Sequence, residues 1–68
     1  MKCVEIKDNV WHNSNEEMPN TTTKVEFMDK SGNILAGEIV IDMAGFYVYI
    51  PSKGWGSFSD MIKWRFIS

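Results

Sequence analysis

The chain has little of several residues that folds and active sites often depend on. Its 68 residues include one cysteine, one histidine and two prolines. One thiol excludes a disulfide within the chain and every zinc site built on several cysteines. No apolar run approaches the roughly 20 residues of a membrane-spanning helix, so no contact with a membrane is predicted.

The single cysteine also indicates the cellular compartment. Cys3 lies beside a predicted N-terminal strand and is expected to act as a small hydrophobic residue. A lone free thiol suits a reducing environment, and the start of the chain has no long apolar segment typical of a signal peptide. The sequence therefore predicts a cytoplasmic protein.

The chain also lacks a strong excess of basic or acidic residues. Seven basic and nine acidic residues are dispersed along the chain and give a net charge of −2. Strong nucleic-acid binding usually needs a basic patch, which this balance does not favour, although it leaves room for a local one.

Aromatic residues, in contrast, are plentiful. Three Trp, four Phe and two Tyr can bury large areas, so a compact core is feasible without a metal or a disulfide. A chain of this length allows one domain, residues 1–68, although a dimer with a shared core is an alternative. We expect a monomer or a homodimer.

A β-hairpin is the clearest local pattern, from Lys24 to Ile41. Two apolar stretches flank a run of turn-forming residues, Asp29 to Asn33. Gly37 interrupts the second stretch, where a glycine often marks a bulge or a sharp bend. This hairpin indicates a fold that is mostly β.

Other strands are predicted from alternation at Lys2–Lys7, Phe46–Ile50 and Met61–Ile67. Short helical turns are predicted at Ser14–Met18, from a capping-box pattern, and at Ser57–Asp60. The expected fold is all-β: a small curled antiparallel sheet or an SH3-like barrel of four or five strands. A three-stranded sheet capped by a helix is the alternative.

Alternation also predicts which side chains form the core, and composition predicts where a loop interrupts the strands. Ser52–Ser57 is expected to be a loop because of its glycines and serines. The predicted core contains Val4, Ile6, Trp11, Val25, Phe27, Leu35, Ile39, Ile41, Phe46, Val48, Ile50, Ile62, Trp64 and Phe66.

One family resemblance rests on spacing. Trp11 and Pro19 are separated by seven residues, a strand begins at Val25, and Ile62-Lys63-Trp64 lies near the end. This pattern resembles the small phage and prophage proteins of domain-of-unknown-function family 551, over roughly residues 10 to 67. The chain departs from that family at Met18, where the family has a leucine, at Lys63, where it has a histidine, and in lacking the family's Pro-Leu ending after Trp64. The resemblance implies a bacterial or phage mobile-element origin, but no activity and no functional residues.

Residues suited to catalysis are sparse. His12 lies in a polar segment and is expected to be a solvated side chain, and adjacent Glu16 and Glu17 do not face one another on a helical turn. Gly54-Trp55-Gly56 lacks the lysine and helix of a phosphate-binding loop. The sequence predicts no enzyme, no cofactor and no metal site.

Five residues are candidates for binding. Trp55 between two glycines can be exposed on a loop, or can fold back over the core. Tyr47 and Tyr49 on one strand, with Lys63 and Arg65 on another, can share a sheet face that stacks bases and contacts phosphates. The alternative is that these four side chains simply cover the second face of a small barrel.

The expected function is therefore a non-enzymatic protein-interaction or accessory module. The alternative is weak binding of single-stranded nucleic acid. A third possibility is self-association by pairing of an exposed edge strand.

Overall fold

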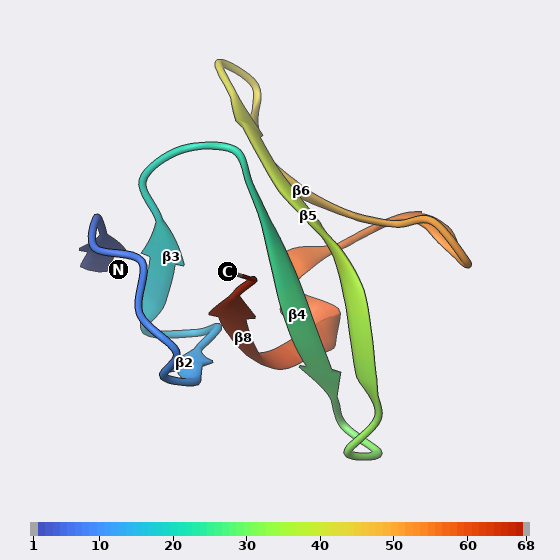
Figure 1. Ribbon diagram of the computed structural model, residues 1–68. Coiled ribbons are helices and arrows are strands. Elements are labelled where there is room, and N and C mark those ends of the chain that lie inside the picture. Colours follow the sequence, from blue (N-terminus) through green and yellow to red (C-terminus); the bar gives the residue numbers. More distant parts are fainter. Residues whose placement is uncertain (1, 68) are drawn as a thin grey trace.

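The structure is a computed structural model, and it describes residues 2 to 67. These residues form one 3-10 helix, Phe58–Asp60, and the strands β1 Lys2–Val4, β2 His12–Asn13, β3 Glu17–Pro19, β4 Thr23–Asp29, β5 Ile34–Asp42, β6 Gly45–Ile50, β7 Gly54–Gly56 and β8 Met61–Phe66 (Figure 1). Six strands make one antiparallel sheet in the order β2-β8-β4-β5-β6-β7, and β1 pairs with β3 in a separate parallel sheet. The prediction of an all-β fold is confirmed.

The predicted hairpin is formed by β4 and β5, with Phe27 opposite Leu35. Its turn is organised by the Asp29 carboxylate, whose Oδ1 accepts hydrogen bonds from the backbone N–H groups of Ser31 and Asn33, each at 2.9 Å. Gly32 in this turn has a φ of 84°, a conformation that favours glycine. Local turn chemistry therefore accounts for the hairpin.

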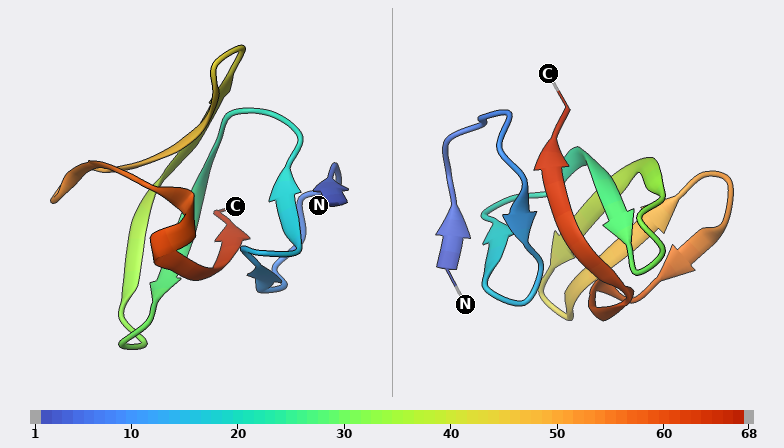
Figure 2. Two further views of the ribbon diagram at one scale, coloured as in Figure 1. Left: turned by 180° about the vertical axis from the view of Figure 1, so that it is seen from behind. Right: turned by 90° about the horizontal axis from the view of Figure 1, so that it is seen from below.

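The sheet curls strongly but does not close into a barrel (Figure 2). Strand β5 pairs with β4 over residues 34 to 39 and with β6 over residues 38 to 42, so its two ends serve different neighbours. Gly37 lies where this change occurs. A Cβ there would come within 2.5 Å of the Tyr49 carbonyl oxygen, so only glycine permits this approach of β6.

The core lies on the concave face of the curled sheet. Its buried hydrophobic side chains are Val25, Phe27, Ile39, Val48, Ile50, Phe58, Trp64 and Phe66. All of these except Phe58, which lies in the 3-10 helix, were predicted from alternation. Val4, Leu35 and Ile41 are partly buried and pack against this cluster, while Trp11 is half-buried outside it.

Three predicted core residues are exposed, each for its own reason. A bulge shifts the register between β4 and β8, so that Met28 pairs with Lys63 but the next residue, Asp29, pairs with Met61. Ile62 is therefore skipped by β4, and its side chain is exposed. Phe46 lies on the β5–β6 hairpin beyond the start of β4, where its ring packs edge-on against Phe58 but stays 37% exposed.

The third exposed residue, Ile6, follows a strand that is shorter than predicted. β1 ends at Val4, and Ile6 is 79% exposed. The helical turn predicted at residues 14 to 18 is also absent, because a hydrogen-bonded turn there leads from β2 into β3 instead. The turn predicted at residues 57 to 60 corresponds to the observed 3-10 helix.

The segment predicted as a loop at residues 52 to 57 contains strand β7. Its middle residue, Trp55, pairs with Tyr49 on β6, and Gly54 enters the strand with a φ of 91°. The two glycines obscured this strand because they remove the alternation by which strands are recognised. Within residues 2 to 67 there is no helix with the length and apolarity needed to cross a bilayer.

Candidate functional site

The convex face of the sheet carries a row of four side chains drawn from four strands. Trp55 on β7 lies opposite Tyr49 on β6, Tyr49 opposite Glu38 on β5, and Glu38 opposite Lys24 on β4. Residues directly opposite one another in antiparallel strands project from the same face. The row therefore points away from the core.

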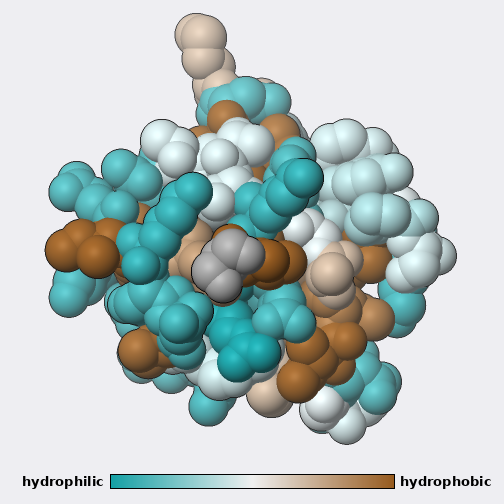
Figure 3. All heavy atoms as spheres, in the orientation of Figure 1, coloured by the Kyte–Doolittle hydropathy of each residue, from teal (hydrophilic) through white to brown (hydrophobic). Residues whose placement is uncertain are grey.

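Trp55 is the most exposed aromatic residue in this row, with 67% of its surface accessible. Its ring packs on Tyr49 with centroids 5.0 Å apart and planes tilted by 54°. In Figure 3, side chains of intermediate hydropathy gather on the right of the molecule, where Figure 1 shows the outer end of the β6–β7 hairpin. Trp55 is thus held by a neighbouring ring and is not folded into the core.

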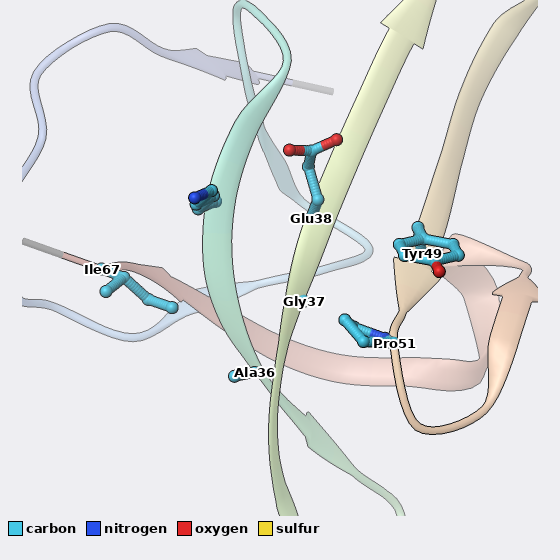
Figure 4. Close-up of a pocket in the computed structure, with 7 residues that line it drawn as sticks. Ala36, Gly37, Glu38, Tyr49, Pro51 and Ile67 are labelled. Atoms are coloured by element: carbon cyan, nitrogen blue, oxygen red, sulfur yellow. The ribbon is translucent and has the colours of Figure 1, made fainter.

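A hollow of about 370 Å³ adjoins Tyr49, and Trp55 is not among the residues that line it. It is lined by Lys24, Ala36, Gly37, Glu38, Tyr49, Pro51 and Ile67 (Figure 4). In Figure 4, Tyr49 and Pro51 stand on one side of β5 and Ile67 on the other. Carbon atoms form most of its wall, and charged groups enter only from Lys24 and Glu38. We call the hollow together with Trp55 the outward aromatic surface.

The predicted partners Tyr47, Lys63 and Arg65 also lie on the convex face, but the structure does not bring them together. β4 and β5 separate the tyrosines on β6 from the basic residues on β8. Arg65 is already engaged: its Nε and Nη2 each lie 2.8 Å from Glu26 Oε1, and its guanidinium carbon lies 4.6 Å from the centroid of the Trp11 ring. The two predicted groups therefore share a face without forming one cluster.

A second cluster surrounds His12, which the sequence indicated to be solvated. That interpretation is wrong, since the side chain is only 6% exposed. Its Nε2 lies 2.9 Å from Asp8 Oδ1 and its Nδ1 lies 3.3 Å from Glu17 Oε2. The ring stacks on Trp64 with centroids 4.7 Å apart, and Trp64 Nε1 donates a hydrogen bond to the Glu17 carbonyl oxygen at 3.0 Å.

The His12 cluster fastens the N-terminal strands to the main sheet. Among residues 2 to 67, β2 pairs in the sheet with β8 alone, at His12 opposite Trp64 and Asn13 opposite Lys63. The hydrogen bond from His12 lowers the pKa of the Asp8 carboxyl. No local pattern could have revealed this cluster, because burial of the imidazole depends on a tryptophan near the other end of the chain.

The remaining polar groups give no further site. Cys3 is exposed, and within residues 2 to 67 no three His, Cys, Asp or Glu side chains are grouped so as to hold a metal ion. A second hollow of about 300 Å³ lies against β7 and is lined by Trp55, by core residues such as Val48 and by the charged side chains of Asp29 and Lys53. The Asn33 and Ser31 backbone N–H groups lower the pKa of the Asp29 carboxyl, so that group serves the β4–β5 turn.

Comparison with known proteins supplies no further information on this surface. No protein-family model matches the chain, and no curated protein or solved structure matches it either. The resemblance to family 551 therefore stays a prediction.

Proposed function

We propose that this protein is a protein-interaction module that binds its partner through the outward aromatic surface. The observation that supports the proposal is the exposure of Trp55, whose ring packs on Tyr49, a residue that lines an apolar hollow. An isolated exposed apolar side chain is ordinary, but a tryptophan packed on a tyrosine at the rim of a hollow can be buried by a partner as one unit.

Energetics support this choice. Trp and Tyr are enriched among the few interface residues that contribute most of the binding free energy. Here Tyr49 restrains the Trp55 ring, so little side-chain entropy is lost when a partner covers it. The convex face between the tyrosines and β8 carries two carboxylates, Glu26 and Glu38, beside the Lys24 ammonium, which makes it a poorer surface for phosphate groups than for a protein.

Affinity capture with matched variants tests the proposal. We expect wild type and a Met43→Ala variant to retain the same protein from a native lysate, and Trp55→Ala to lose it. Met43 is a suitable control because it is also exposed and apolar but lies at the tip of the β5–β6 hairpin, which projects from the body in Figure 3.

The dependence of binding on salt concentration distinguishes a protein partner from a nucleic acid. Capture through an apolar surface should persist as salt rises, whereas nucleic-acid binding should fall steeply and be abolished by nuclease. Retention of the same protein by Trp55→Ala would contradict the proposal, as would a nuclease-sensitive partner.

A further inference from the structure

The outward aromatic surface offers hydrogen-bond donors that nothing in the described chain uses. Within residues 2 to 67, neither the Trp55 indole N–H nor the Tyr49 hydroxyl makes a hydrogen bond, and the Lys24 ammonium forms no ion pair. An indole N–H is a donor only, and an ammonium group has no acceptor. The surface therefore combines apolar walls with unused donors.

A partner that fits these properties must supply apolar bulk and acceptors, and it needs few donors. A proline-rich segment does so, because each proline has a carbonyl but no N–H. In the polyproline II conformation such a segment makes no internal hydrogen bonds, so its carbonyls remain free to accept. Its rings can pack against an aromatic side chain, and it loses little entropy on binding because it is already extended.

The shape of the hollow agrees with this chemistry. Tyr49 and Pro51 form one side and Ile67 the other, with the bare backbone of Gly37 between them (Figure 4). Because Gly37 has no side chain and Ala36 has only a methyl group, the hollow stays open along β5. Trp55 does not line this hollow but packs on Tyr49, so that a bound chain that continues past Tyr49 would reach a second aromatic ring.

The Glu38 carboxylate adds a further requirement for the partner. Glu38 is half-buried at the hollow and, among the described residues, its carboxylate has no ion pair. A guanidinium group forms the strongest hydrogen bonds with such a carboxylate, since its paired N–H groups match the two oxygens. Lys24, its neighbour across the strands, is exposed and can reach a carbonyl of the bound chain.

We propose that the hollow lined by Tyr49 binds a proline-rich segment of a partner protein that carries an arginine opposite Glu38. This proposal rests on the function proposed above and names the chemistry of the partner.

The test is a titration of the full chain, labelled with 15N, with a synthetic peptide of one arginine followed by ten prolines. We expect saturable shifts of the backbone amides at residues 36 to 38, of the Tyr49 amide and of the Trp55 indole N–H, with a Kd below about 1 mM. Decaproline without arginine should bind about tenfold more weakly, and a glycine–serine peptide of equal length should not bind.

Two variants localise the binding. Trp55→Ala should weaken binding of the arginine–proline peptide at least about tenfold, because it removes both the exposed indole and the ring that packs on Tyr49. Glu38→Gln should reduce its affinity to that of decaproline, and Met43→Ala should leave it unchanged. Circular dichroism spectra that match wild type would show that each variant is folded.

Absence of shifts at several millimolar peptide would overturn the inference, as would shifts confined to other strands or equal binding by Trp55→Ala. If this titration fails while a lysate protein is still captured in a Trp55-dependent manner, the proposed function stands and only the proline-rich partner is wrong. If capture does not depend on Trp55, the proposed function itself fails.

Discussion

Replacing Gly37 by alanine should destabilise the protein, although strand propensity alone predicts the opposite. Alanine in a strand interior is usually better than glycine by about 0.5–1 kcal/mol. At Gly37, however, the new Cβ would lie 2.5 Å from the Tyr49 carbonyl oxygen, 3.1 Å from a Phe27 ring carbon and 3.2 Å from Ile50 Cγ1. The first of these neighbours is backbone, so the β5–β6 contact itself must open.

Forcing a methyl group into a packed site costs about 1–3 kcal/mol, so the net loss should be about 1–2 kcal/mol. A 68-residue domain has roughly 3–10 kcal/mol of stability in total. The loss is therefore large enough to measure. With a urea m-value of about 1 kcal/mol/M, typical of a small domain, the unfolding midpoint should fall by about 1–2 M.

Urea unfolding monitored by circular dichroism measures this change, and Gly56→Ala is the matched control. A Cβ at Gly56 would meet nothing within 4 Å, and its φ is not positive. That variant should be unchanged or more stable by up to about 1 kcal/mol, because alanine restricts the unfolded chain. A Gly37→Ala variant as stable as Gly56→Ala would refute the close approach of β6 to β5 on which the hollow depends.

Three other changes have expected outcomes. Trp64→Ala should lower the free energy of unfolding by about 3–5 kcal/mol, because the ring is fully buried; a cooperatively melting variant of near wild-type stability would contradict its central place. Stability should fall as pH decreases from about 5 towards 2, because the folded-state pKa values of Asp8 and Asp29 lie below the ordinary value of 3.8. The two carboxylates contribute their full stabilisation above pH 3.8, and this stabilisation is lost as the pH falls through their folded-state pKa values. Asp29→Asn should make this pH dependence shallower in acid titrations followed by circular dichroism, and an unchanged slope would contradict its role. Fluorescence anisotropy should show no binding of oligothymidine at low salt, because Arg65 is held by Glu26; tight, salt-sensitive binding would contradict that inference.

Local patterns predicted the parts of the fold whose causes are local. The β4–β5 hairpin follows from a turn that Asp29 and Gly32 can build by themselves. Alternation likewise identified β6 and β8 and most of the buried residues. The error at Ile62 arose because a bulge changes the direction of one side chain without any sign in the residues nearby.

The candidate site was predicted only in part, because its geometry depends on pairing between distant segments. The sequence singled out Trp55 and Tyr49 as separate candidates, but their packing requires β7, a strand that its glycines conceal. It also did not indicate the hollow, which exists because Gly37 lets β6 approach β5. Burial of His12 was missed for a similar reason, since Trp64 provides it from across the sheet.

Photo-crosslinking from the hollow tests most directly whether the outward aromatic surface binds a protein. The variant Tyr49→p-benzoylphenylalanine would be irradiated in native lysate, with Met43→p-benzoylphenylalanine as the control at the hairpin tip. We predict one dominant protein adduct from position 49, suppressed by excess wild-type protein but not by excess Trp55→Ala. An adduct that forms equally from both positions, or that excess Trp55→Ala suppresses as well as wild type does, would contradict the account.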